Sequence, residues 1–395
     1  MICWNDDMPL ELLQKQQLEG INAQIELIRR SGSRSAVRFE KIGKGLSSLD
    51  DLSKIPVITS KDVAELGTDL VCVPQREIKR IVSLRTSGTE LVKKIYFTRY
   101  DQEQTVQFFA EGMAQLCSKG DKVIILMPGT SSDGITGLLS EGLRRIGAVP
   151  ENPQIGSDYK LLAKQCEEAH TIVAMPGTLR RLALTAPHLK PRNVLLSADY
   201  ISPSCVKTIE RIWQSEVYIH YGMTETCYGF AVDCPYHKGM HIRNRDYYVE
   251  IIDPVTHKLL PHGEKGLVVL TSLRREAMPL IRYCTGDIGV MVAEPCGCGH
   301  SLPRIERVFG REDALIQRPN INELDDVLMG FDSVLDYTAD FIDNRLEIGI
   351  FANGIDDKVA RALESAYPEF EVSVFVHSEL LNNGTKKRKL GKLTP

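Results

Sequence analysis

The sequence lacks the features that mark membrane and secreted proteins. No apolar run approaches the ~18 residues of a membrane-spanning helix, and the acidic start, Met1 to Asp7, has no signal-peptide pattern. A net charge of -4 over 395 residues gives no reason to expect nucleic acid as a partner. No internal repeat is visible. We therefore expect a cytoplasmic enzyme that acts on small molecules, with neither nucleic acid nor a membrane as partner.

The remaining pattern predicts an α/β protein. Strand-like runs alternate with helical segments, which favours a mainly parallel sheet whose ligands bind beyond the strand ends. The runs span residues 81–84, 122–127, 171–175, 193–196 and 217–220, and several lead into loops of small residues such as Pro176-Gly177. We predict an N-terminal domain over 1–312, with a small antiparallel β subdomain at about 230–310, and a small α+β C-terminal domain over 313–395.

Three loops carry the residues of chemical interest. Tyr221-Gly222-Met223-Thr224-Glu225 follows a strand-like run, and Tyr283-Cys284-Thr285-Gly286-Asp287 comes about sixty residues later. An aromatic ring, a glycine and an acid at a strand end can hold a nucleotide and its metal, and Asp287 can bind a ribose. Upstream, Thr86-Ser87-Gly88-Thr89 offers hydroxyls and backbone N–H groups to an anion. An ordinary polar turn is the alternative for this loop, since no Walker pattern follows.

The order and spacing of these loops resemble the adenylate-forming enzymes. Thr86 to Thr89 match the start of the family's phosphate loop, Glu90-Leu91 replace its next Thr-Gly, and Lys94 takes its final position. The Tyr-Gly-x-Thr-Glu motif is complete, and Gly310 to Asp313 resemble the hinge before a mobile C-terminal domain. The branch that this chain resembles is that of the phenylacetate–coenzyme A ligases, which also includes coenzyme F390 synthetase-like proteins. The similar segments are 9–13, 52–59, 239–242, 249–254 and 278–283.

The resemblance implies a two-step reaction. A carboxylate attacks the α-phosphate of ATP to give an acyl-adenylate and pyrophosphate, and coenzyme A then displaces AMP. The implied roles are phosphate binding by the 86–89 loop, Mg²⁺ binding by Glu225, adenine stacking by Tyr221, binding of both ribose hydroxyls by Asp287, and a ribose or phosphate contact by Arg311. The implied nucleotide site also includes Ser197, Ala198, Asp199, His220, Gly222, Met223 and Thr224.

The acyl pocket is expected after the 122–127 run. Asp133, Gly134 and Gly137 would line it together with Tyr221 and Gly222. Gly134 and Gly137 would leave room for a flat ring, although tight helix packing explains these two glycines equally well. An aromatic, phenylacetate-like acid is implied by the resemblance.

Three of the ten cysteines and three of the nine histidines lie in two loops, Cys234, His237 and His241 in one and Cys296, Cys298 and His300 in the other. Cys-x-Cys plus a distant Cys and His suits a tetrahedral, structural Zn²⁺. We predict Cys234, His241, Cys296 and Cys298 as ligands, because matching positions recur in the resembling branch, and His237 could replace His241. Reduced cysteines in loops are the alternative.

The C-terminal part departs from the family pattern. Gln317 to Asn322 replace the usual glycine-containing segment, and either Lys386 or Lys392 could be the adenylation lysine; a solvated basic tail is the alternative. The first function hypothesis is therefore an acid–coenzyme A ligase. The second is an adenylating enzyme that passes its acyl group to a carrier protein or an amine, or that stops at the adenylate. The third is a nucleotide-binding protein without catalysis. A homodimer is possible by analogy with the family.

Overall fold

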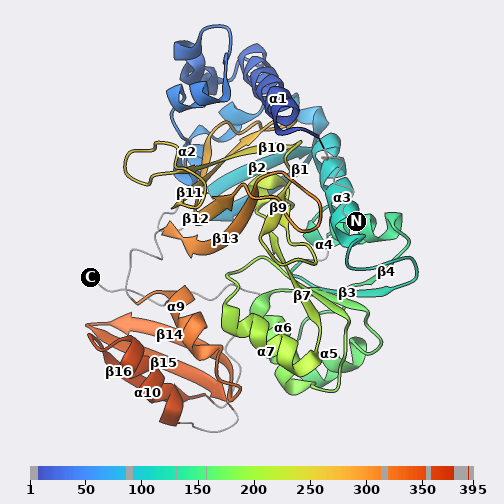
Figure 1. The fold of residues 1–395 in the computed structure, drawn as a ribbon, viewed down its shortest axis with the longest axis vertical. Coiled ribbons are helices and arrows are strands. Elements are labelled where there is room, and N and C mark those ends of the chain that lie inside the picture. The colour runs from blue at the N-terminus through green and yellow to red at the C-terminus, as the bar shows by residue number, and fades with distance from the viewer. Residues whose placement is uncertain are drawn as a thin grey trace. The chain divides into compact units, whose positions relative to one another are not determined.

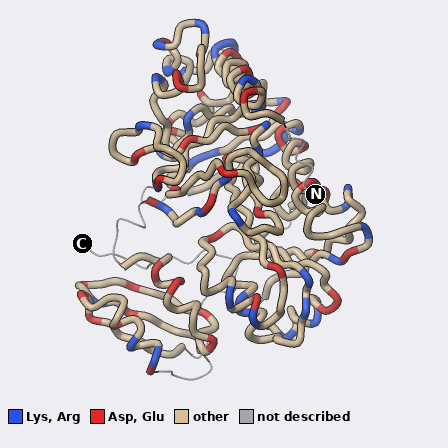
Figure 2. Tube along the Cα trace, viewed as in Figure 1, with Lys and Arg blue, Asp and Glu red and all other residues tan. Residues whose placement is uncertain are grey.

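A computed structural model describes residues 8–85, 92–129, 131–156, 158–312, 319–352, 357–377 and 390. The chain divides into two compact units (Figure 1), residues 1–115 with 221–312 and residues 116–220 with 313–395. The division differs from the predicted sequence domains, which remain a prediction, as does the mobility of the C-terminal one. Acidic and basic residues are interspersed along the described trace of each unit (Figure 2).

The first unit holds an antiparallel sheet in the order β10-β11-β12-β13-β9-β8. A separate hairpin pairs β1 with β2. The strands are β1 Ile78–Arg85, β2 Val92–Thr98, β8 Ala231–Val232, β9 Met240–Ile242, β10 Tyr247–Ile252, β11 Lys265–Ser272, β12 Tyr283–Val292 and β13 Arg304–Arg311; the helices are α1 Leu10–Arg30, α2 Ser60–Leu66 and α3 Arg99–Met113. Short 3-10 helices span 34–42, 49–54, 67–70, 75–77 and 224–226.

Helix α1 shows why this unit has a continuous core. Its buried positions Leu13, Ile21, Ile25 and Ile28 follow the spacing of one helix face. This face contributes to a core cluster that also contains Phe39 from the first 3-10 helix and residues beside β11 and β12.

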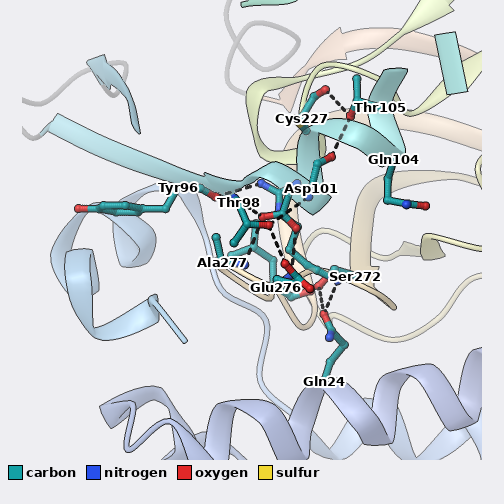
Figure 3. A network of polar contacts seen from close by, with 12 residues as sticks. Gln24, Tyr96, Thr98, Asp101, Gln104, Thr105, Cys227, Ser272, Glu276 and Ala277 are labelled. Carbon is teal, nitrogen blue, oxygen red and sulfur yellow. Dashed lines mark hydrogen bonds and ion pairs between the residues drawn. The ribbon is translucent and has the colours of Figure 1, made fainter. Parts of the chain in front are cut away.

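A buried acid fixes the connection between β11 and β12 (Figure 3). The carboxylate of Asp101 accepts hydrogen bonds from the backbone N–H groups of Glu276 at 2.9 Å and Ala277 at 3.2 Å. It also closes a capping box with Thr98, the N-cap of α3. This arrangement places Asp101 in the first turn of α3 and Thr98 at the cap. The network thereby holds the chain just before Tyr283 and Asp287.

The second unit holds five parallel strands in the order β4-β3-β5-β6-β7. Their bounds are β3 Lys122–Leu126, β4 Val149–Glu151, β5 Thr171–Ala174, β6 Asn193–Leu196 and β7 Glu216–Tyr221, whose last residue belongs to the first unit; the helices are α4 Ile135–Arg145, α5 Tyr159–Gln165, α6 Pro176–Thr185 and α7 Pro203–Trp213. Every residue of β5 and β6 is buried, as expected for parallel strands covered on both faces. Pro176-Gly177, predicted as a loop, forms the first turn of α6, since proline suits that position.

The C-terminal segment belongs to the same unit. It comprises α9 Ile321–Leu328, β14 Val334–Ile342, β15 Arg345–Ala352, α10 Asp357–Ala366 and β16 Glu371–Val376, with the strands in the order β14-β15-β16. Arg180 of α6 is 1% exposed and donates to the carbonyls of Met329, Phe331 and Val334 at 2.9, 2.6 and 2.6 Å. This buried guanidinium anchors the turn between α9 and β14 to α6, and the two parts share one core cluster. The predicted α/β class, with parallel, antiparallel and small C-terminal sheets, is confirmed.

Candidate nucleotide and metal sites

A bulge in β12 projects Asp287 from the sheet of the first unit. Leu267 pairs with Ile288 and Val269 with Cys284, so the three residues Thr285 to Asp287 stand opposite Val268 alone. The Thr285 hydroxyl donates to the Val268 carbonyl at 2.9 Å and accepts from the Asp287 backbone N–H at 3.0 Å. Bulges of this kind redirect a side chain out of the regular pleat. The Thr-Gly-Asp motif therefore encodes the direction of one carboxylate.

The glycine of this motif makes room for Arg311. Gly286 has φ +76°, and a Cβ there would lie 2.7 Å from Nη2 of Arg311. The Arg311 guanidinium donates to the Thr285 carbonyl at 2.6 Å and lies 3.9 Å from the Asp287 carboxylate. Arg311 is 47% exposed, so this ion pair contributes little to stability, and the guanidinium remains accessible to a ligand.

Tyr221 at the end of β7 is oriented by Asp287. Its hydroxyl donates to Oδ2 of Asp287 at 2.6 Å, and the edge-to-face contact with Phe230 has a centroid distance of 5.4 Å. Burial, together with the neighbouring Asp287 charge, raises the pKa of Tyr221 well above its usual value. Tyr221 is therefore a neutral hydrogen-bond donor whose ring is held in place at both ends.

Glu225 lies in the 3-10 turn that follows, and its carboxylate is buried. Oε1 accepts a hydrogen bond from the Tyr283 hydroxyl at 2.6 Å and forms an ion pair with the ammonium of Lys93. Burial is the largest influence and opposes ionisation, but Lys93 and the hydrogen bonds to the carboxylate together outweigh it and lower the pKa of Glu225. Glu225 is thus a carboxylate, the state that a Mg²⁺ ligand needs.

The sequence motif does not identify Lys93 as a site residue, because the lysine position of the phosphate-loop motif falls on Lys94. In β2 the side chains alternate, so Lys93 points inward and Lys94 is exposed. The signal was available in the alternation itself: Ile95 and Phe97 continue the buried face that begins at Lys93.

The second unit holds a polar pair of its own. The Ser197 hydroxyl and Nδ1 of His220 are 2.8 Å apart, and both residues are buried. Ala198 has φ +71°, a left-handed conformation that is unusual for alanine. The Ser197 to Asp199 segment thus leaves β6 in a constrained turn.

The predicted acyl-pocket residues lie at the start of α4 in the second unit. A Cβ on Gly137 would lie 2.1 Å from the Ser132 carbonyl oxygen, so close packing against this turn explains the glycine. Gly134 is the N-cap of α4, and the Asp133 carboxylate accepts a hydrogen bond from the Ser131 hydroxyl. The packing explanation is favoured for Gly137, and a substrate role for these residues stays a prediction.

The four predicted zinc ligands converge in the first unit. The possible ligand atoms of Cys234, His241, Cys296 and Cys298 all lie within 4.8 Å of one another. Sγ of Cys234 is 3.6 Å from Sγ of Cys296, and Sγ of Cys298 is 3.4 Å from Nε2 of His241. The edges of a zinc tetrahedron built from these ligand types are about 3.6–3.8 Å long.

Neighbouring contacts separate His241 from the alternative His237. Nδ1 of His237 lies 2.6 Å from the Asp233 carboxylate and is hydrogen-bonded to it, whereas His241 lies in the cluster with the three cysteines. Burial, followed by His300 and Arg304, lowers the pKa of His241 to about 3, which keeps the imidazole neutral. Arg304 also donates to the carbonyls of Lys238 and Glu294, joining the two cysteine-bearing loops.

Several predicted residues lie outside the described part of the chain. These are the phosphate-loop residues Thr86, Ser87, Gly88 and Thr89 and the candidate lysines Lys386 and Lys392. In the described part, no helix has the length and apolarity required to cross a bilayer.

Comparison with known proteins identifies similar sequences. The sequence is 26% identical to a phenylacetate–coenzyme A ligase of Pseudomonas putida over 401 residues, covering 98% of this chain and 87% of that protein. The match to the corresponding ligase of Thermus thermophilus is also 26% identical and covers 71% of this chain, which spans 65% of that relative's length. The chain is similar in sequence to the phenylacetate–coenzyme A ligases. No family model matches it.

Solved structures show the same fold. A 2-hydroxyisobutyryl–coenzyme A ligase in the postadenylation state, in complex with 2-HIB-AMP, superposes with a TM-score of 0.82 at 20% identity, covering 97% of this chain and 90% of that one. A benzoate–coenzyme A ligase from Burkholderia xenovorans gives 0.52 at 15% identity, covering 74% and 65%. The fold is that of the adenylate-forming coenzyme A ligases.

Proposed function

We propose that this chain activates a carboxylic acid with ATP and transfers the acyl group to coenzyme A. In the first step an acid oxygen bonds to the α-phosphorus while the bond to pyrophosphate breaks. In the second the coenzyme A sulfur bonds to the acyl carbon, AMP leaves, and the thiol proton goes to solvent. The observation that carries the proposal is the pairing of Tyr221 with Asp287 and of Glu225 with Tyr283, which joins two motifs about sixty residues apart in the sequence.

The first unit supplies several groups that a nucleotide needs. Asp287 would accept the ribose hydroxyls, Tyr221 would stack on adenine, and Arg311 would reach ribose or phosphate oxygens. Glu225 fits a Mg²⁺ ion, since it is an ionised and buried carboxylate; such an ion would neutralise charge on the triphosphate. Preorganised groups of this kind lower the cost of reorganisation during the reaction.

The remaining predicted residues keep their roles as proposals. Thr86 to Thr89 would hold the β- and γ-phosphates, and Lys386 or Lys392 would serve the adenylation step. Ser197, Ala198, Asp199 and His220 would line the adenine. An aromatic acid is proposed because the related ligases are named for phenylacetate.

Carboxylate-dependent exchange of pyrophosphate into ATP tests the first step. A panel of aromatic and short aliphatic acids would be used, with no-acid reactions as the background. We expect exchange with at least one acid, and failure with every acid despite ATP binding would refute the enzyme assignment. Repeating the panel with coenzyme A and measuring thioester and AMP tests the second step. Exchange without thioester would instead support a carrier protein or an amine as acceptor.

We also propose that Cys234, His241, Cys296 and Cys298 hold a structural Zn²⁺. The support is the close approach of the four ligand atoms and the loops already joined by Arg304. With four protein ligands the ion would have no open position, and its contribution would be to stabilise the two loops. Elemental analysis should give about one zinc per purified chain, and much less for Cys296→Ser. His237→Ala is the matched control and should retain the metal; equal zinc in wild type and Cys296→Ser would refute this ligand set.

A further inference from the structure

Lys93 follows the predicted phosphate loop closely in the sequence. Arg85 at the end of β1 pairs with Val92 at the start of β2, so residues 86–91 connect two directly paired strand ends. Lys93 follows Val92, and its side chain lies on the buried face of β2. A cation at this position is four residues beyond Thr89, the end of the segment proposed to hold the β- and γ-phosphates.

Lys93 is also a buried charge with a specific carboxylate partner. The residue is 7% exposed, and its ammonium pairs with Oε1 of Glu225 and lies 3.3 Å from the Tyr283 hydroxyl. Burying an ion pair rarely adds stability compared with apolar residues of the same size. The pair is therefore poorly explained by stability alone, and its position suggests a role in the reaction.

The contacts at Glu225 create a conflict with a metal ion. Lys93 and Tyr283 both bind Oε1. A divalent cation on the same carboxylate would stand next to a buried ammonium, and like charges repel strongly at such short range in a poorly hydrated site. The repulsion falls if the ammonium moves toward an anion, and the triphosphate of the nucleotide is such an anion.

We propose that Lys93 and Mg²⁺ are alternative cations for Glu225. Lys93 neutralises the carboxylate before nucleotide binds, and it moves to a phosphate oxygen when the metal–nucleotide complex takes Glu225. This rests on the proposed function for the identity of the nucleotide. Lys93 thereby lowers the affinity of the site for a free divalent ion and favours binding of metal and phosphate together.

The test measures metal binding without turnover. Mn²⁺ would be titrated into the protein without nucleotide, at about pH 8 so that an unpaired Glu is ionised, and followed by electron paramagnetic resonance. Lys93→Met should bind Mn²⁺ at least about tenfold more tightly than wild type, since it removes a competing charge. Lys94→Met, which removes the same charge from the exposed face of β2, should behave as wild type. Equal Mn²⁺ affinity for the two variants would overturn the proposal.

A second measurement follows the phosphate contact. Lys93→Met should raise the dissociation constant of ATP–Mg²⁺ about tenfold or more relative to Lys94→Met, the loss expected for a charge-assisted hydrogen bond. If Lys93→Met does not fold, Lys93→Gln keeps a polar side chain and tests the same two constants. An unchanged ATP–Mg²⁺ constant would overturn the phosphate contact. Absence of exchange with every acid would refute the enzyme assignment while leaving the Mn²⁺ result to decide this inference.

Discussion

Asp287→Asn should weaken nucleotide binding strongly and stability little. The substitution keeps the size of the side chain and an acceptor for the Tyr221 hydroxyl, which lies 2.6 Å from Oδ2. Its ion pair with Arg311 is 3.9 Å long and half exposed on the arginine side, so losing it should cost about 0–1 kcal/mol. A hydrogen bond from a ribose hydroxyl to a carboxylate contributes about 1.5–3 kcal/mol. The dissociation constant of ATP should therefore rise by roughly 10- to 150-fold.

The assay compares two nucleotides on two proteins. ATP and 2′,3′-dideoxy-ATP would be titrated into wild type and Asp287→Asn by calorimetry, with thermal unfolding as the folding control. Because the dideoxy nucleotide lacks both hydroxyls, the substitution should change its affinity much less than that of ATP. Equal losses for the two nucleotides would show that Asp287 does not bind the ribose, and a large fall in the unfolding temperature would refute the small cost assigned to the ion pair.

Three further substitutions test the supporting structure. Gly286→Ala should lower acid-dependent exchange about tenfold or more, because alanine is strained at φ +76° and its Cβ, 2.7 Å from Nη2, would displace the Arg311 guanidinium; unchanged exchange would contradict this role of the glycine. Asp101→Asn should destabilise the fold by about 2–4 kcal/mol in denaturant unfolding, since it leaves Arg275 without its buried carboxylate at 3.7 Å, and a loss below about 0.5 kcal/mol would contradict the role of this network. Burial opposes ionisation of Asp246, but two neighbouring arginines lower its pKa, so the ionised carboxylate stabilises the fold fully above the ordinary pKa of 3.8 and loses this effect as the pH falls through the lowered pKa. Asp246→Asn should therefore lose less stability than wild type on acidification below about pH 4. Parallel curves of stability against pH for the two proteins would refute this.

Much of the fold could be read from local patterns. The apolar spacing of α1 and the mainly apolar strands β5 and β6 identify elements whose type depends on their own residues. Boundaries were less readable where two explanations compete locally. Pro176-Gly177 has a composition typical of turns, yet proline also favours the first position of a helix, and here the helix forms.

The candidate site could be predicted from the sequence where the residues of a motif determine their own backbone conformation. Thr285 to Asp287 form one bulge, and the glycine within it is required by its positive φ. Lys93 was missed because its role depends on strand phase: two adjacent lysines have the same chemistry, and only their alternation decides which one is buried.

By itself, the sequence determined the chemical groups available: an aromatic residue and an acid at 221–225, a second acid at 287, and a set of cysteines and histidines. The tertiary structure decided which of them meet. It joined Glu225 to Lys93 rather than Lys94, tied His237 to Asp233, and placed His241 with the three cysteines. The physical reason is that spacing along a chain specifies which face of an element a side chain occupies, whereas the distance between two elements depends on the packing of everything between them.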